Sequence, residues 1–154
     1  MLASLVLAAA VAAAHPAPPA IEPVQVEALP AEQIAVGCGC TYYSTPRPVA
    51  GKEILRWNRA EGGGATMKLD GEVRRLRVVQ EKHLPRARET PRYADRLVLI
   101  LGDDHYMVEV ASSVKRACRP QSASCAGTGY AAAFILRRDG AARRELRGWG
   151  ECGC

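Results

Sequence analysis

The dipeptide Asp70-Gly71 lies between two segments in which apolar and polar residues alternate, ATMKL before it and EVRRLRVV after it. Glycine, and aspartate better than most residues, tolerate the positive φ angles of a two-residue type I′ turn, so this pattern predicts a β-hairpin. The expected opposed pairs are Leu69 with Glu72, Met67 with Arg74, and Ala65 with Leu76. Because side chains alternate between the two faces of a strand, this register decides which residues reach the core.

The two faces of this hairpin differ in chemistry. The apolar face, which we expect to join the core, consists of Ala65, Met67, Leu69, Leu76 and Val78. The other face is mainly basic and consists of Thr66, Lys68, Val73, Arg75, Arg77 and Val79. The hairpin is therefore predicted to be half core and half basic surface.

A second hairpin is predicted after a polar loop at residues 82–95, with its turn at Asp103-Asp104 and Gly102 opposite His105. The expected apolar pairs are Leu101 with Tyr106, Leu99 with Val108, and Leu97 with Val110. The opposite face carries Val98, Ile100 and Met107. Because both faces are apolar, we expect the strand at residues 96–101 to be covered on both sides.

A third hairpin is indicated by Asp139-Gly140, between the segments AAAFILRR and AARRELRGW. No segment after the N-terminal leader keeps a helical period of 3.6 residues. Six to eight short strands at hairpin spacing predict an all-β fold, a small antiparallel barrel or sandwich that disulfide bonds stabilise.

The N-terminal region predicts export. Residues 1–14 contain an uncharged apolar run that ends in AAA before His15, which is typical of a signal peptide and too short to span a bilayer. Residues 15–36 are rich in Pro and Ala without a regular period, and we interpret them as a disordered tether. Residues 37–154 then form a single β domain, in a periplasmic or secreted protein.

The six cysteines predict a disulfide framework, because export leads to an oxidising compartment. Two CGC motifs open and close the domain; the full set is Cys38, Cys40, Cys118, Cys125, Cys152 and Cys154. Two cysteines one residue apart on a strand lie too far apart to bond without strain, so pairing between the two motifs is favoured. Antiparallel neighbours would join Cys38 to Cys154 and Cys40 to Cys152, whereas parallel neighbours would exchange the partners. Cys118 and Cys125 would close a short loop.

A metal site is the alternative for the two CGC motifs. The four thiolates of Cys38, Cys40, Cys152 and Cys154 could bind Zn²⁺ or Cu⁺ tetrahedrally. Structural zinc sites usually have two or more residues between paired cysteines, and export favours oxidation, so disulfides are the preferred interpretation.

The charge of the chain indicates an anionic partner. It contains 21 Lys and Arg against 16 Asp and Glu, a formal net charge of +5. Clustered arginines match carboxylate and phosphate groups. The candidate anion-binding residues are Lys68, Arg75, Arg77, Arg143 and Arg144. We expect an envelope protein or a polyanion, and no nucleic acid, because few aromatic residues are present for base stacking.

Catalysis has little support in the sequence. No P-loop, dinucleotide fingerprint, zinc-hydrolase motif or serine elbow occurs. Asp103, Asp104 and His105 form a compact group, which we interpret as a solvated turn. The sequence thus predicts a non-catalytic binding or structural module without a cofactor.

Three features together resemble a class of exported bacterial proteins with no assigned function. These are Cys38 and Cys40 followed by Tyr42 and Tyr43, the central ATMKLDGEVRRLRVV hairpin, and the closing GWGECGC. The resemblance covers most of the mature domain and implies an exported β protein, but no activity. The size and strand content also resemble those of periplasmic lysozyme inhibitors, in architecture only.

Overall fold

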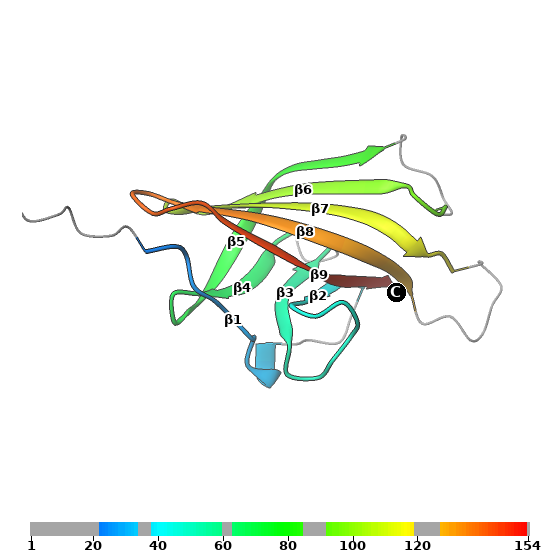
Figure 1. Cartoon of the computed structure of the whole chain (residues 1–154), viewed down its shortest axis with the longest axis horizontal. Helices are drawn as coiled ribbons and strands as arrows, with labels where there is room; N and C mark the ends of the chain where they lie inside the picture. Colours follow the sequence, from blue (N-terminus) through cyan, green and yellow to red (C-terminus); the bar gives the residue numbers. More distant parts are fainter. Residues whose placement is uncertain (1–21, 34–37, 60–62, 85–91, 119–126, 154) are drawn as a thin grey trace, which may run out of the picture.

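The computed structural model describes residues 22–33, 38–59, 63–84, 92–118 and 127–153 (Figure 1). The described part contains no α-helix. Its elements are β1 (Val26–Glu27), the 3-10 helix η1 (Ala31–Gln33), β2 (Gly39–Tyr43), β3 (Glu53–Asn58), β4 (Ala65–Leu69), β5 (Glu72–Leu84), β6 (Arg96–Gly102), β7 (Tyr106–Arg116), β8 (Thr128–Arg138) and β9 (Arg144–Gly153). Among these elements, no helix is long and apolar enough to cross a membrane.

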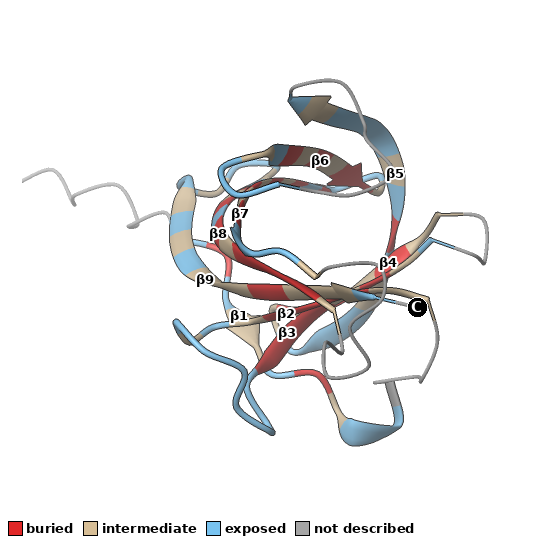
Figure 2. Ribbon diagram, turned by 90° about the vertical axis from the view of Figure 1, so that its right-hand side faces the viewer, coloured by how far each residue is buried: buried red, intermediate tan, exposed pale blue. Residues whose placement is uncertain are grey.

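Eight of the strands form a closed antiparallel barrel, which confirms the predicted all-β class (Figure 2). Around the barrel the order is β4, β3, β2, β9, β8, β7, β6 and β5, and pairing of β5 with β4 closes the circle. The extra strand β1 pairs with Lys68 and Leu69 of β4, beyond the point where β3 stops pairing.

The barrel interior is filled by the inward residues of every strand. Tyr42 and Phe134 meet edge to face, with ring centroids 5.7 Å apart. Gly150 faces Tyr42 across the β2–β9 pair, where a Cβ atom would lie 2.5 Å from the tyrosine ring. The other large side chains with essentially no exposure include Leu55, Met67, Leu69, Leu76, Leu99, Leu101, Val108 and Leu136.

The first predicted hairpin is confirmed in every pair. Leu69 lies opposite Glu72, and Ala65 opposite Leu76. Asp70 and Gly71 have φ angles of 49° and 86°, the two positive values that a type I′ turn requires. The expected core face is buried, apart from a half-buried Val78.

The register predicted for the second hairpin was wrong by two residues. Gly102 pairs with Met107 and Leu101 with Val108, rather than with His105 and Tyr106. The Asp103 side chain accepts hydrogen bonds from two backbone N–H groups of the loop and so stabilises a longer connection. Because the shift is an even number of residues, the apolar pairs still face inward.

Two further details of this region differ from expectation. The strand β6 is covered on its inner face only. On the outside of the barrel, Val98 and Ile100 of β6 are half-buried, and Met107 of the neighbouring strand β7 is 44% exposed. The expected loop at residues 82–95 begins later, since β5 passes a bulge between Val78 and Gln80 and continues to Leu84. The third hairpin forms around Asp139-Gly140, but its second strand begins at Arg144, opposite Leu136, rather than at Ala141.

Part of the expected tether at residues 15–36 belongs to the folded domain. Val24 and Leu29 are buried, and β1 pairs with β4. Single apolar residues between the prolines pack against the barrel here. The Pro-rich composition of the segment does not by itself reveal this contact. The expected signal peptide at residues 1–14 lies outside the described residues.

The antiparallel cysteine pairing is confirmed for one bond. Cys40 and Cys152 lie directly opposite each other on β2 and β9 and form a disulfide. Cys38 and Cys118 each take part in a disulfide bond as well. Their expected partners, Cys154 and Cys125, lie outside the described residues.

Candidate functional site

Three of the five candidate anion-binding residues are engaged within the protein. Lys68 forms an ion pair of 2.6 Å with Glu27 on β1. Arg144 donates hydrogen bonds to the Val24 carbonyl at 2.6 Å and to the Gln25 side chain at 3.3 Å, which holds the N-terminal segment against the barrel. Arg143 pairs with Glu145 at 2.6 Å. Lys68 and Arg144 are therefore poor candidates for binding an external anion, whereas Arg143 is exposed and paired only with its near neighbour Glu145.

Arg75 and Arg77 remain available on the outer face of β5. Both are exposed, and Arg75 has no ion-pair partner among the described residues. Arg77 comes within 3.8 Å of Asp104, but both side chains are more than three-quarters exposed, at 80% and 91%. Such an exposed pair contributes little and is easily exchanged for another anion.

Two cations extend this pair into a row that the sequence did not reveal. Lys82 lies on the same outer face of β5, and Arg96 lies opposite Leu84 at the end of β6. Both are exposed and have no ion-pair partner in the described part of the chain. We call Arg75, Arg77, Lys82 and Arg96 the basic row. Residues 80–84 read QEKHL and show no alternation of apolar and polar residues, so the sequence carries no clear signal of the longer strand.

A second charged group lies on the inner side of β5. Glu81 and His83 pair with Leu99 and Leu97, which face the core, so their side chains point to the same side. The Glu81 carboxylate contacts Arg59 at 2.9 Å and the His83 ring at 2.8 Å. The Arg59 guanidinium also lies 5.7 Å from the centre of the Trp57 ring. The charged groups on the inner side of β5 are thus paired with one another, whereas the only ion pair of the basic row among the described residues is the exposed contact of Arg77 with Asp104.

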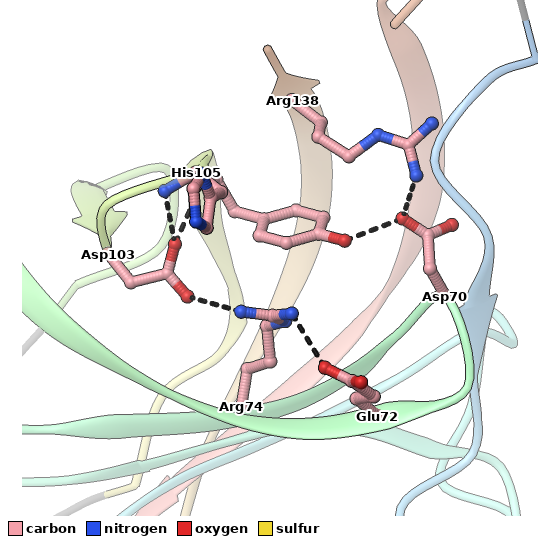
Figure 3. A network of polar contacts seen from close by, with 7 residues as sticks. Asp70, Glu72, Arg74, Asp103, His105 and Arg138 are labelled. Atoms are coloured by element: carbon pink, nitrogen blue, oxygen red, sulfur yellow. Dashed lines mark hydrogen bonds and ion pairs between the residues drawn. The ribbon is translucent and has the colours of Figure 1, made fainter.

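A third polar group joins the hairpin turns at the opposite end of the barrel (Figure 3). The Asp70 carboxylate accepts hydrogen bonds from the Tyr106 hydroxyl at 2.7 Å and from Arg138 at 2.6 Å. Its other oxygen accepts the backbone N–H of Gln25 at 2.7 Å. One side chain thus connects the β4–β5 turn to β7, β8 and the N-terminal segment.

Arg74 continues this group toward the β6–β7 loop (Figure 3). Its guanidinium contacts Glu72 at 2.6 Å and Asp103 at 3.5 Å, and it lies 4.7 Å from the centre of the Tyr106 ring. The remaining Asp103 oxygen accepts the backbone N–H groups of His105 and Tyr106. Asp103 and His105, which we interpreted as parts of a solvated turn, are therefore both in contact with neighbouring groups.

The pKa directions agree with a structural role for these groups. Burial raises the pKa of the Asp70 carboxyl, but the hydrogen bonds from Gln25, Tyr106 and Arg138 outweigh it, so the pKa lies below its ordinary value. For Asp103, burial is likewise outweighed by two backbone N–H groups and Arg74. Burial raises the pKa of Tyr106. The network is thus held as charged carboxylates and neutral tyrosine, which fasten the turns together.

The four-thiolate metal site considered for the CGC motifs cannot form in this oxidised protein. Cys40 and Cys152 supply two of the four required thiolates, and they are bonded to each other. Among the described residues, no three His, Cys, Asp or Glu side chains are grouped so that they could hold a metal ion. The basic row is therefore the candidate site with the best geometric support.

Comparison of the chain with models of protein families, with curated protein sequences and with solved structures found no match.

Proposed function

We propose that this chain is an exported binding module that recognises an anionic partner in the cell envelope through the basic row. The observation that carries the proposal is that Arg75, Lys82 and Arg96 are exposed cations without a described acidic partner on one face of the barrel. Exposed arginines and lysines attract carboxylate, sulfate or phosphate groups.

The rest of the molecule supports the role of a rigid binding module. Large side chains fill the barrel interior, and the Cys40–Cys152 disulfide joins its first strand β2 to its last strand β9. A disulfide is compatible with an oxidising, extracytoplasmic location. The N-terminal signal pattern supports secretion or a periplasmic location in particular.

The test is binding to fluorescent poly-L-glutamate. Reversing two charges in Arg75→Glu/Arg77→Glu should weaken binding by at least about tenfold, because two attractions become repulsions. A matched control, Arg47→Glu/Arg143→Glu, changes the net charge equally at exposed positions outside the basic row. It should change binding by less than about threefold, the loss that a general charge effect produces.

The salt dependence provides a second readout. Binding by exposed charges should weaken steadily as the salt concentration rises, because salt screens such contacts. Binding that is independent of salt, or that both double variants weaken equally, would refute the basic row as the site.

A further inference from the structure

The second half of β5 has a neighbouring strand on one side only. Pairing with β4 ends where Ala65 meets Leu76, while pairing with β6 runs from Arg77 to Leu84. In Figure 2, β5 continues upward past β4 beside β6. Within the described residues, no strand pairs with the other edge of this half, which we call the open edge.

The direction of the backbone groups follows from the neighbouring hairpin. The N–H of Asp103 donates to the carbonyl of Tyr106, and alternation from that pair directs the backbone groups of Leu97 and Leu99 toward β7. Val98 and Ile100 then face β5, where they pair with Lys82 and Gln80.

The intervening residues of β5 must therefore point the other way. The N–H and C=O groups of Glu81 and His83 face the open edge, where no described strand pairs with them, and neither residue takes part in a turn or loop backbone hydrogen bond among the described residues. Unpaired backbone groups of this kind are a template for one more strand.

The side chains beside the open edge indicate which strand would fit. On the outer face, Arg77 and Lys82 are exposed and separated by four steps of the β5–β6 ladder, about 13 Å at the usual rise per residue. On the inner face, Glu81 is already paired with Arg59 and His83. A strand laid here meets positive charge on one face only.

A second copy of this chain fits poorly. Antiparallel pairing of two β5 edges in one continuous sheet keeps inner residues opposite inner residues. The register that uses all of residues 80–84 places Lys82 opposite Lys82, and the register centred on Glu81 places Glu81 opposite Glu81; like charges directly opposite each other are destabilising. An edge lysine and a bulge are also common protections against such pairing.

We propose that the open edge of β5 binds an extended acidic segment of a partner protein as an additional strand. The segment would carry acidic residues four positions apart on its outer face, beside Arg77 and Lys82. This inference rests on the proposed function and specifies its partner as a peptide strand, in which backbone hydrogen bonds provide affinity and the paired charges provide selectivity.

The experiment compares synthetic peptides on the intact oxidised protein. The parent peptide, TEVTVET, has glutamates four residues apart. Two derivatives are N-methylated on alternate amides. One is methylated on the amides of the second, fourth and sixth residues, which include both glutamates, and the other on the amides of the third, fifth and seventh residues. Since N-methylation removes a backbone donor and leaves every charge in place, the set that faces β5 should weaken binding at least about tenfold and the other less than about threefold.

Amide hydrogen exchange gives a second, independent measurement. The parent peptide should slow exchange of the Glu81 and His83 amides, while poly-L-glutamate, which binds through charge alone, should not slow it to the same extent. These two amides become hydrogen-bonded only if a strand is added.

The outcomes separate the two proposals. If both derivatives bind like the parent while Arg75→Glu/Arg77→Glu still weakens binding, strand addition is wrong and the charge-based function stands. If neither the peptide nor poly-L-glutamate binds, both proposals fail. Protection of Glu81 and His83 that depends on protein concentration without peptide would instead show self-association and overturn the acidic partner.

Discussion

Asp70 serves two purposes in this fold. As the first residue of the type I′ turn it adopts a φ of 49°, which few residues other than glycine tolerate. As a carboxylate it accepts hydrogen bonds from Tyr106, Arg138 and the backbone of Gln25. The first purpose could be predicted from the Asp-Gly dipeptide. The second could not, because its partners are 36, 68 and 45 residues away.

Replacing Asp70 with asparagine isolates its charge, because asparagine also tolerates a positive φ. Asp70→Asn should lower the free energy of unfolding by about 1–3 kcal/mol at neutral pH, the usual cost of breaking a hydrogen-bonded group of this kind. The measurement is urea unfolding, with Asp104→Asn, an exposed aspartate on the neighbouring loop, as the control that should change little.

The pH dependence of this variant has a definite sign. The pKa of Asp70 is depressed in the folded protein, so its stabilisation is present above the unfolded pKa and is lost as pH falls through the folded value. The difference between wild type and Asp70→Asn should therefore shrink as the pH falls below about 4, near the ordinary aspartate pKa. A difference that grows on acidification would contradict the assigned network.

At the scale of elements, the face of the strand on which each residue lies was easier to predict than the register or the length of the strand. The second hairpin slipped by two residues, yet Leu97, Leu99 and Leu101 still reached the core. A period of two fixes the face of a residue, whereas the Asp103 hydrogen bonds that lengthen the loop depend on three-dimensional geometry. The basic row was only half predicted for the same reason, since Lys82 and Arg96 follow from the true extent of β5 and β6.

The GWG segment of β9 gives a prediction about how neighbouring strands pack. Gly150→Ala would place a Cβ atom 2.5 Å from the Tyr42 ring, which is buried and held against Phe134. We expect a loss of about 1–3 kcal/mol in the free energy of unfolding, the usual cost of overpacking a core. The fitting control is Gly64→Ala, where the nearest atoms are 3.5 Å and 3.8 Å away. Thermal unfolding should show a lower Tm for the first variant and little change for the second.

At the scale of the whole molecule, barrel closure was the part that local pattern could not decide. A barrel and a sandwich share the same alternating strands, and they differ here in whether β5 pairs with both β4 and β6. One long strand makes both contacts: residues 72–76 of β5 pair with β4, and residues 77–84, which include the bulge between Val78 and Gln80, pair with β6. The placement of the CGC motifs, by contrast, was informative, since adjacent antiparallel end strands were one of two arrangements that their symmetry allowed.

The Cys40–Cys152 bond then closes the barrel covalently, across a sequence separation of 112 residues. Loop-entropy arguments assign about 4–5 kcal/mol to a loop of this size, although native strain and residual structure reduce the measured gain. Cys40→Ala/Cys152→Ala should therefore lower the free energy of unfolding by about 2–5 kcal/mol. Urea unfolding of the two oxidised proteins measures this loss. An unchanged unfolding free energy, or free thiols at both positions in folded protein purified from its native compartment, would show that the two end strands are held together by their ladder and core contacts alone.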